Sequence, residues 1–417
     1  MSTNYVMIGA GPAAQAAAKA VRAADKDGIV TFIAREETLP YSPVALPYLL
    51  DDMQSDELFA KGKAMLKDLN ISFLTGKEAK GVDVAGKKVL FTDGSSQSYD
   101  KLLVASGASP MRVAVDGLAP EDTFVFRTYA DYERLVAECR KGGDVLIYGA
   151  GLVSVELAEK LAHSGYKVTI VVRSHLLRRY FSKDTVATLQ KMFADKGVTI
   201  LGGTTISSAK KEGAKYVVAL SNGETRNFDA IVMALGVTPN LLEGLEVAGG
   251  GIKADEWLMA APDVFVAGDV AAPADYTGSI YEPCPISPEA AKQGKIAGRN
   301  MVSDTTGEKE RYEGWVSMNY FRIFDENLFS IGEIEGQTTL DCEVIGTGNG
   351  NKTLKLLLQD GRLVGVEGFG QKEAHPGVFG FLIRNRVPVG ENRELLLKKP
   401  RETALWLMQT YRQENKL

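Results

Sequence analysis

The chain has 417 residues, of which 45% are hydrophobic and 24% charged, and its formal net charge is −5 at pH 7. This length predicts two or three domains, and the balance is ordinary for a soluble globular protein. The net negative charge does not indicate a nucleic-acid partner. The apolar runs are too short and too interrupted to span a bilayer. Because the first strand begins at about Tyr5, there is no room for a signal peptide, and we expect a cytoplasmic protein.

Short apolar runs typical of buried parallel strands alternate with helical patterns over most of the chain. The predicted strands of this kind cover residues 4–9, 29–34, 101–105, 144–149, 167–172, 229–235 and 263–268. Helices are predicted at about 12–24, 152–164 and 184–196. Meander-like strands fill 79–92 and 214–221, with turns at Asp93-Gly94 and Asn222-Gly223. The alternation predicts a βαβ arrangement, and it occurs twice.

After about residue 310 the pattern changes to antiparallel strands. They are predicted within residues 315–324, 328–336 and 353–370, with a turn at Asp360-Gly361, and helices follow at about 376–386 and 400–413. This region is predicted to be a third, α+β domain.

The first Gly turn, Gly9-Ala-Gly11-Pro-Ala-Ala14, follows the first strand and opens the first helix. Gly9 permits a tight turn, Gly11 lets the backbone approach a pyrophosphate, and Ala14 is small enough for close packing of helix on strand. Glu36, after the second strand, is the candidate for the ribose hydroxyls. The competing interpretation of Glu36 is an exposed loop acid beside Arg35.

The second Gly turn is Gly149-Ala-Gly151-Leu-Val-Ser154, and Glu156 follows two residues later. No acid stands near Val172, where a ribose-binding carboxylate is expected, and arginines follow at Arg173, Arg178 and Arg179. Guanidinium groups suit a 2′-phosphate, so these residues favour NADP(H). A solvated basic loop is the alternative, and a missing acid does not exclude NADH.

Two shorter signatures complete the pattern. One strand ends in Ser106-Gly107 and another in Gly268-Asp269, whose carboxylate suits a ribityl hydroxyl. The helix beginning near Pro288 is placed to direct its positive N-terminal dipole at a flavin.

In this order the signatures resemble the two-dinucleotide-binding flavoproteins of the pyridine nucleotide–disulfide oxidoreductase superfamily, and ferredoxin reductase-like members in particular. The resemblance covers about residues 4–310. It implies an α/β fold of two Rossmann-like nucleotide-binding domains, one inserted in the other, plus the C-terminal α+β domain. The implied boundaries are 1–113 and 242–310 for FAD, 114–241 for NAD(P), and 311–417 for a C-terminal interface domain.

The resemblance also implies the cofactors, a resident FAD and a visiting nicotinamide nucleotide, and their ligands. The residues implied for FAD are Gly9, Gly11, Pro12, Ala13, Ala14, Arg35, Glu36, Ala79, Ser106, Gly107, Gly268 and Asp269. Those implied for NAD(P) are Gly149, Gly151, Leu152, Val153, Glu156, Arg173, Arg179 and Gly236. Glu156 is the candidate catalytic residue, since the family places a Glu there beside the nicotinamide and the flavin N5.

The chain departs from the thiol-dependent members. Coenzyme A disulfide reductase-like members carry their redox Cys just before a similar ALPY stretch, and this chain has Val44 there. The cysteines are Cys139, Cys284 and Cys342, so none lies between residues 1 and 138, and they form no CxxC. We therefore expect no thiolate relay, no intrinsic iron–sulfur cluster and no metal site. Tyr48 stands where ferredoxin reductase-like relatives often carry a Lys.

The electrons are then expected to leave for an external acceptor. Residues 384–401 carry six basic residues and two acids, a surface that could attract an acidic iron–sulfur protein or subunit, although a solvated charged face is the plainer interpretation. The likeness extends to NADH-coupling flavin subunits of anaerobic complexes, of the tungsten aldehyde oxidoreductase or phenylglyoxylate dehydrogenase type. That likeness favours NAD(H) over NADP(H), and a homodimer or a heteromeric complex.

Two other functions remain open from the sequence. One is a self-contained NAD(P)H oxidase or disulfide or peroxide reductase, against which the missing thiol counts. The other is a non-enzymatic flavoprotein that senses NAD(P)H.

Overall fold

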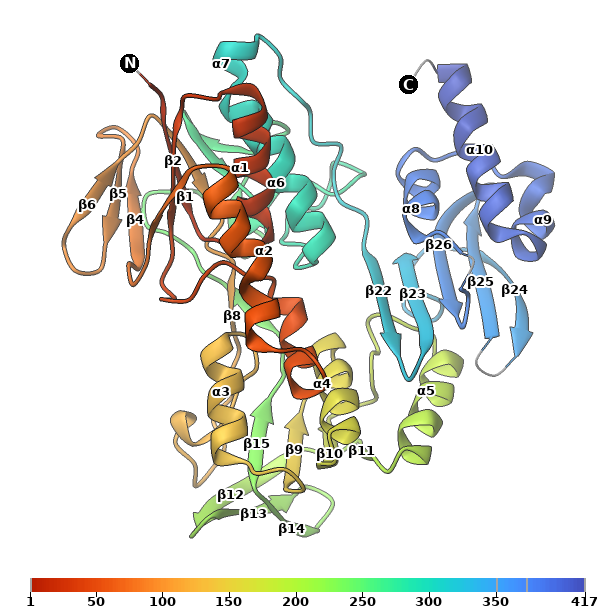
Figure 1. Ribbon diagram of the computed structural model, residues 1–417. Coiled ribbons are helices and arrows are strands. Elements are labelled where there is room, and N and C mark those ends of the chain that lie inside the picture. The colour runs from red at the N-terminus through yellow and green to blue at the C-terminus, as the bar shows by residue number, and fades with distance from the viewer. Residues whose placement is uncertain (1, 350–351, 373, 416–417) are drawn as a thin grey trace. The chain divides into compact units, whose positions relative to one another are not determined.

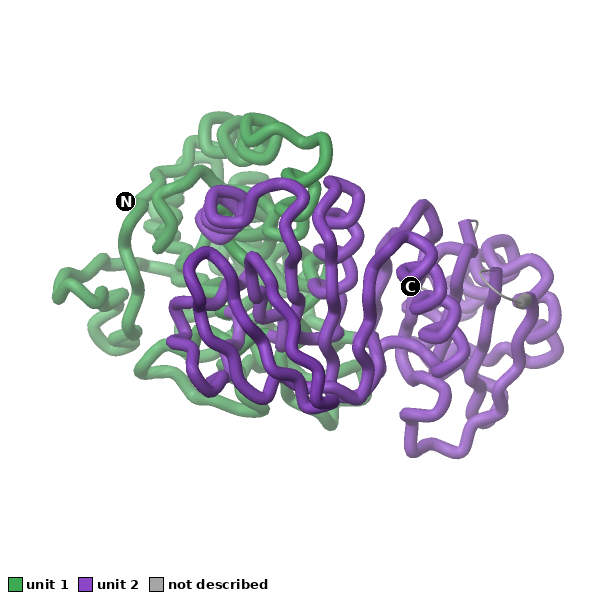
Figure 2. The backbone as a smooth tube through the Cα atoms, turned by 90° about the horizontal axis from the view of Figure 1, so that it is seen from below, with its two compact units in different colours: residues 1–109, 127–129, 237–315 green, residues 110–126, 130–236, 316–417 purple. Residues whose placement is uncertain are grey.

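The computed structural model describes residues 2–349, 352–372 and 374–415, which form two compact units (Figure 2). Unit 1 comprises residues 1–109, 127–129 and 237–315, and unit 2 comprises residues 110–126, 130–236 and 316–417. The second nucleotide-binding region and the C-terminal region thus belong to the same unit. The finer division into three domains stays a prediction.

Unit 1 is built on a six-stranded sheet in the order β19-β20-β7-β1-β2-β3 (Figure 1). Its strands are β1 (Asn4–Ile8), β2 (Ile29–Ile33), β3 (Ile71–Leu74), β7 (Lys101–Val104), β19 (Met259–Ala261) and β20 (Val264–Val266). All neighbours are parallel except the edge pair β19 and β20. The strands predicted at 4–9, 29–34, 101–105 and 263–268 are confirmed as its buried centre.

Helices α1, α2 and α6 lie on one side of this sheet, and the three-stranded sheet β4-β5-β6 lies on the other (Figure 1). The helices are α1 (Pro12–Ala24), α2 (Ser55–Asp68), α6 (Ser287–Met301) and the short α7 (Ser303–Thr306). The smaller strands are β4 (Ala79–Asp83), β5 (Lys88–Phe91), β6 (Ser96–Ser98), β8 (Ala108–Pro110), β16 (Val237–Pro239), β17 (Val247–Ala248), β18 (Gly251–Lys253) and β21 (Ala271–Ala272). A 3₁₀ segment covers Pro43–Leu50.

Helices α1 and α6 touch backbone to backbone. A Cβ atom on Gly294 would lie 2.0 Å from the carbonyl oxygen of Ala13, and one on Gly298 would lie 2.5 Å from that of Ala17. Any larger residue at these two α6 positions would push the helices apart. This contact sets the start of α1 against the middle of α6.

Unit 2 begins with a four-stranded parallel sheet in the order β11-β10-β9-β15. Its strands are β9 (Asp144–Tyr148), β10 (Lys167–Val172), β11 (Thr199–Gly202) and β15 (Ala230–Met233), which confirms the predictions at 144–149, 167–172 and 229–235. The accompanying helices are α3 (Tyr129–Glu138), α4 (Leu152–His163) and α5 (Lys183–Asp195). An antiparallel sheet joins β12 (Ile206–Glu212), β13 (Lys215–Leu220) and β14 (Thr225–Phe228), with Asn222-Gly223 at its second turn.

The rest of unit 2 is an antiparallel five-stranded sheet with helices, as predicted for the region after residue 310. The strand order is β22-β23-β26-β25-β24. The elements are β22 (Met318–Ile323), β23 (Glu326–Gly332), β24 (Glu343–Asn349), β25 (Lys352–Gln359), β26 (Arg362–Phe369), α8 (Pro376–Arg384), α9 (Arg393–Lys398) and α10 (Pro400–Asn415). Asp360 and Gly361 form the turn between β25 and β26 with φ of 49° and 69°, the left-handed pair that a two-residue hairpin loop prefers. Among the described residues, no helix combines the length and the apolar character that crossing a membrane requires.

A buried carboxylate joins the two parts of unit 2. Glu367 on β26 is 2% exposed, and it accepts hydrogen bonds from the Ser182 backbone N–H at 2.6 Å and the Ser182 hydroxyl at 2.7 Å. The Thr185 hydroxyl donates to it at 2.5 Å. Ser182 is the N-cap residue of α5, so a carboxylate from the C-terminal sheet neutralises the free N–H groups at the start of that helix.

We expect Glu367→Ala to destabilise the protein by about 2–4 kcal/mol, because buried donors at the start of α5 would lose their acceptor. Thermal unfolding monitored by circular dichroism would measure the loss. The matched control is Glu343→Ala, which removes an exposed ion pair with Arg393 and should cost less than about 1 kcal/mol. Equal effects of the two substitutions would contradict the assignment.

Candidate functional site

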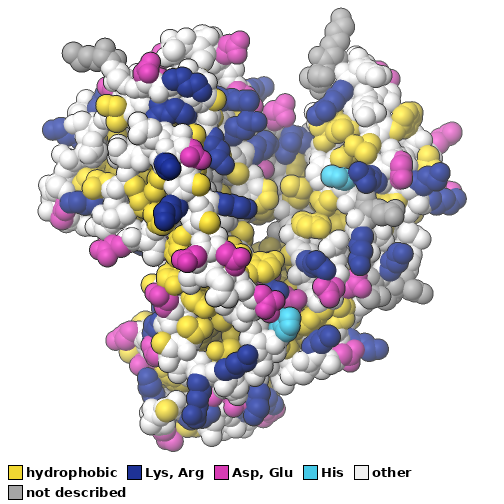
Figure 3. Space-filling view, viewed as in Figure 1, with side chains coloured by type: hydrophobic (Ala, Val, Ile, Leu, Met, Phe, Trp, Pro, Cys, Tyr) yellow, Lys and Arg dark blue, Asp and Glu magenta, His cyan; other side chains and the backbone are white. Residues whose placement is uncertain are grey.

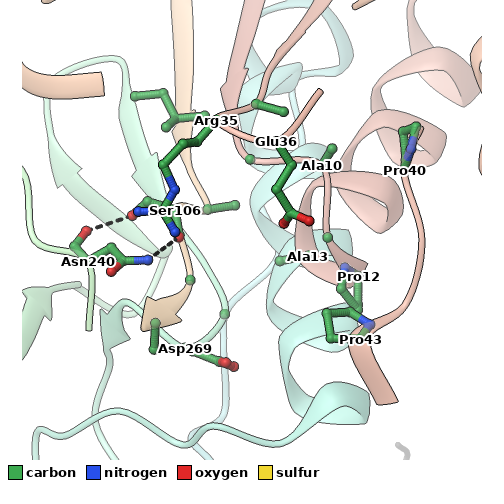
Figure 4. A pocket seen from close by; sticks show the side chains of 18 of the residues that line it. Ala10, Pro12, Ala13, Arg35, Glu36, Pro40, Pro43, Ser106, Asn240 and Asp269 are labelled. Carbon is green, nitrogen blue, oxygen red and sulfur yellow. Dashed lines mark hydrogen bonds between the residues drawn. The ribbon is translucent and has the colours of Figure 1, made fainter. Parts of the chain in front are cut away.

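A cavity of about 400 Å³ lies within unit 1, in the size range of roughly 300–1,000 Å³ that is usual for small-molecule sites. It is lined by the β1–α1 turn, the ends of β2, β7 and β20, and the start of α6 (Figure 4). Of the residues predicted to hold FAD, those on its wall are Gly9, Gly11, Pro12, Ala13, Arg35, Glu36, Ala79, Ser106, Gly107, Gly268 and Asp269. Ala14 is instead fully buried within α1.

The first Gly turn, Gly9–Ala14, is tightly held at its first residue. Gly9 has a φ of 109°, and a Cβ atom there would lie 2.1 Å from the carbonyl oxygen of Ala105, just beyond β7. Its N–H donates to the carbonyl of Ile33 on β2 at 2.7 Å. Only glycine fits this position.

The same turn leaves the start of α1 open. Gly11 is the N-cap residue and has an ordinary φ of −76°, yet a Cβ atom there would meet no described atom within 4 Å. The first turn of α1 carries no acidic residue, and no side chain caps it. Free N–H groups with a positive dipole therefore face open space, which is the arrangement that binds a pyrophosphate.

Two carboxylates stand at the ends of strands around the cavity (Figure 4). Glu36, beyond β2, accepts a hydrogen bond of 2.7 Å from the Tyr41 hydroxyl. Asp269, beyond β20, forms an ion pair of 2.8 Å with Arg127. Both carboxylates keep further lone pairs for hydroxyl groups of a bound molecule.

Ser106 and Asn240 close another part of the wall (Figure 4). The Ser106 hydroxyl donates to the Asn240 carbonyl, and the Asn240 amide donates back to the Ser106 carbonyl, each at 2.8 Å. The pair fastens the chain that returns from residue 237 onward to the end of β7. Arg35 forms an exposed ion pair of 3.3 Å with Glu78.

Sequence reasoning missed some polar groups of the cavity, among them Thr38, Tyr41, Arg127 and Asn240. The buried Thr38 hydroxyl has no hydrogen-bond partner among the described residues although it lies in the cavity wall. An unpartnered buried hydroxyl is costly, so the Thr38 hydroxyl is available to hydrogen-bond a molecule bound in the cavity. Together with the open helix start and the two carboxylates, it makes a set of donors and acceptors that fits FAD.

The second Gly turn, Gly149–Ser154, reproduces the first within unit 2. Gly149 has a φ of 132°, and a Cβ atom there would lie 2.1 Å from the carbonyl oxygen of Ala234, beyond β15. Its N–H donates to the Val171 carbonyl on the neighbouring strand at 3.0 Å. A Cβ atom on Gly151 would again meet no described atom within 4 Å, and the first turn of α4, which begins at Leu152 and Val153, has no acid.

The loop after β10 carries the two arginines predicted to bind the nucleotide. Arg173 and Arg179 are both exposed, while Leu176 and Leu177 between them are buried. The Leu177 N–H donates to the Ala150 carbonyl at 2.8 Å, which fastens the loop to the second Gly turn. Gly236, with a φ of 110°, ends the segment after β15. The arrangement leaves the arginines accessible to a nucleotide on that turn.

Glu156 lies in the second turn of α4 and is partly buried. Burial, with a smaller contribution from the Glu159 carboxylate, raises the pKa of Glu156 to about 7, against the opposing charge of Lys160. A carboxyl group with this pKa exists in both protonation states near neutral pH. Such a group suits a place where charge on a bound ring changes.

The cysteine thiols differ from redox-active thiols in their burial and in the direction of their pKa shifts. Cys139 and Cys284 are buried, and burial raises the pKa of Cys139 to about 11 and that of Cys284 still further. Burial also raises the pKa of Cys342. Val44, which stands in place of a redox Cys, lies in the cavity wall and is 55% exposed, and no described residue of that wall is a cysteine.

Comparisons with known proteins agree on one family. The profile described as "Pyridine nucleotide-disulphide oxidoreductase" matches residues 3–294. The chain is 30% identical to the NADH-dependent phenylglyoxylate dehydrogenase subunit epsilon of Aromatoleum evansii, over 98% of each chain. It is 27% identical to the NADH-rubredoxin oxidoreductase of Clostridium acetobutylicum, over 80% of this chain and 83% of that one. A putidaredoxin reductase–putidaredoxin complex has the same fold, with a TM-score of 0.85, 20% identity and coverage of 98% and 99%.

The two open Gly positions give a paired prediction. Gly11→Ala and Gly151→Ala should both fold normally, because the added methyl groups enter open space at ordinary φ. Gly11→Ala should weaken FAD binding at least roughly tenfold, or by about 1.4 kcal/mol, and Gly151→Ala should do the same to the nicotinamide nucleotide while FAD is retained. Flavin fluorescence on dilution and nucleotide titration would measure the two affinities. Loss of the same ligand in both variants would contradict the assignment.

The raised pKa of Glu156 predicts a pH-dependent gain from Glu156→Gln. In the unfolded chain the carboxyl ionises near pH 4.5, whereas in the folded chain it ionises near pH 7, so ionisation destabilises the fold increasingly from pH 4.5 to 7. The variant should therefore be more stable than the parent at pH 8.5, by up to about 3 kcal/mol, and nearly equal at pH 4.5. Melting temperatures across this pH range would test it, and a gain independent of pH would be inconsistent with a raised pKa.

Proposed function

The chain belongs to the pyridine nucleotide-disulphide oxidoreductase family, and from this membership we propose an electron-transfer function. The protein exchanges two electrons with NAD(H), and passes single electrons between FAD and an external iron–sulfur protein or subunit. The observation that carries this proposal is Val44 in the cavity wall, in a chain whose cysteines all have a raised thiol pKa. Electrons that enter the flavin find no thiol at that wall.

The assembly is proposed from the likeness along the whole chain. The phenylglyoxylate dehydrogenase relative is a subunit by name, and the match covers 98% of each chain. We place this chain in a similar role, as the flavin subunit of a larger complex or as a reductase of a free iron–sulfur protein. A cytoplasmic location and the oligomeric state stay predictions.

The residues of unit 1 hold and orient the cofactor. The start of α1 receives the pyrophosphate, Glu36 the adenosine ribose, and Asp269 the ribityl chain. Bound FAD supplies the ability to take up two electrons together and to release them singly. The hydrogen bonds between Ser106 and Asn240 hold the segment that follows residue 237 against the end of β7, so that this part of the cavity wall stays in place.

The residues of unit 2 hold the nicotinamide nucleotide. The start of α4 receives its pyrophosphate, and Glu156 serves as the catalytic residue beside the nicotinamide. A carboxyl group with a pKa of about 7 can be ionised when the ring is positively charged and neutral when it is not. We propose NAD(H) as the nucleotide, and Arg173 and Arg179 as the groups that would accept a 2′-phosphate if NADP(H) binds.

The C-terminal helices offer the surface for the acceptor. Figure 3 shows Lys and Arg side chains over the C-terminal segment, mixed with acidic and hydrophobic ones. Of the six basic residues between 384 and 401, Arg393 pairs with Glu343 and Lys398 with Glu394. Arg386, Lys399 and Arg401 are exposed and have no ion pair with any described residue, so these three are the charges best placed to attract an acidic partner.

An anaerobic experiment tests the proposed function. The purified flavoprotein is mixed with NADH or NADPH, flavin absorbance is followed, and a ferredoxin or a one-electron viologen dye is then added. We expect NADH to bleach the flavin quickly and the acceptor to restore its colour. Arg173→Ala and Arg179→Ala should leave NADH binding unchanged and weaken NADPH binding by about 1–3 kcal/mol.

Other outcomes of this experiment would overturn the proposal. Lack of bleaching by either nucleotide would exclude transfer from the nicotinamide. Rapid turnover of a disulfide or peroxide by the isolated protein would contradict the argument from Val44. If air is then admitted and the reduced flavin is reoxidised rapidly, with oxygen reduced to hydrogen peroxide or water and no transfer to the iron–sulfur acceptor, the oxidase alternative would be favoured.

The acceptor surface gives a separate kinetic prediction. Lys399→Glu and Arg401→Glu should lower kcat/KM for an acidic ferredoxin roughly tenfold at low salt, with the difference shrinking as salt is added. Bleaching by NADH should not change. The control is Lys88→Glu, an identical charge change at an exposed position on β5 in unit 1, which should leave ferredoxin kinetics near those of the parent.

A further inference from the structure

A chain of buried hydrogen bonds runs behind the cavity of unit 1. The Gly268 N–H donates to the Gln293 side-chain oxygen at 2.8 Å, and the Gln293 amide donates to the Tyr312 hydroxyl at 3.3 Å. Tyr312 in turn donates to the Glu289 carboxylate at 2.6 Å. Gln293, Tyr312 and Glu289 are 0%, 4% and 7% exposed, so the chain is shielded from water over its whole length.

One end of this chain lies in the cavity wall, and the other lies at the start of α6. Gly268 immediately precedes Asp269, and both line the cavity. Glu289 occupies the first turn of α6, where Ser287 and Ala290 line the cavity while Glu289 itself is not a lining residue. The buried carboxylate is therefore near the space that the start of α6 faces.

A carboxylate at this position offsets the positive end of the α6 helix dipole. The N-terminus of a 15-residue helix carries a partial positive charge, and a buried negative charge in its first turn offsets it. The cation that faces Glu289 is Lys292, at 3.7 Å, which also lies over the Tyr312 ring. Because the Lys292 side chain is 30% exposed and that of Glu289 only 9%, water screens the cation more than the carboxylate.

We propose that Glu289 is a positioning residue with two effects on the FAD site. Through Tyr312 and Gln293 it fixes the Gly268 amide and so the place of Asp269, and its buried charge lowers the reduction potential of the bound flavin. The inference rests on the proposed function, since it requires FAD in the cavity of unit 1. A lower potential favours onward transfer from the reduced flavin to an iron–sulfur acceptor.

The test is a reductive titration of the flavoprotein against reference dyes, without nucleotide or acceptor. Glu289→Gln keeps an oxygen that accepts from Tyr312 but removes the charge, and should shift the midpoint potential in the positive direction. Lys292→Met removes the opposing cation and should shift it in the negative direction. The control is Glu310→Gln, which makes the same charge change at the far end of α6. Glu310 pairs with Arg299 of the last turn of that helix, and this substitution should leave the potential unchanged.

The series of hydrogen bonds from Glu289 to Gly268 is tested by a separate measurement, the rate of FAD release. Tyr312→Phe leaves the carboxylate in place but interrupts the path to Gln293, and should speed the release of FAD several-fold. Equal potentials for the parent, Glu289→Gln and Lys292→Met would overturn the electrostatic effect, and unchanged FAD release in Tyr312→Phe would overturn the positioning effect. A parent protein that binds no FAD would overturn the proposed function itself, which separates that failure from failure of this inference.

Discussion

The approach of one backbone to another at Gly9 and Gly149 is the constraint on which both proposed nucleotide sites depend. At each position the space for a side chain is taken by a carbonyl oxygen of a neighbouring segment, that of Ala105 in one case and that of Ala234 in the other. In both cases this oxygen lies 2.1 Å from where a Cβ atom would stand. The close approach holds each strand end so that the next helix starts toward open space. Because the N–H groups at a helix start have no partners within the helix, each turn offers a binding site for an anion.

The same requirement for small residues extends to the support of the proposed FAD site. Gly294 and Gly298 bring α6 against α1, so the starts of the two helices border one cavity. Their charges differ in consequence. The start of α1 has no acid and suits a pyrophosphate, whereas α6 carries Glu289 in its first turn. Two helix ends with similar dipoles are thereby given different electrostatic characters by a single residue.

Much of this architecture could be predicted from the sequence because its signals are local. The buried strands around Val6 and Leu146 are recognisable as short apolar runs, and the Gly turns that follow them are contiguous. The cavity wall was less accessible to prediction. Thr38 and Arg127 have no local motif, and they reach the site only through the path of the chain. The union of the C-terminal sheet with the second nucleotide-binding region was also unforeseen, because it depends on Glu367 meeting the start of α5 from 182 to 185 residues away.

Val44 links the fold to the choice of chemistry. A thiol in the cavity wall would keep electrons within the chain, since a disulfide stores a pair, and its chemistry requires an accessible thiolate. A valine side chain stores none, and the buried Cys139 and Cys284 are held as neutral thiols by their surroundings. The flavin is then the last carrier that this chain supplies, so the acceptor must approach from outside. The proposed acceptor surface, on which Lys399 and Arg401 are exposed and form no ion pair with any described residue, would be the counterpart of a cavity without a thiol.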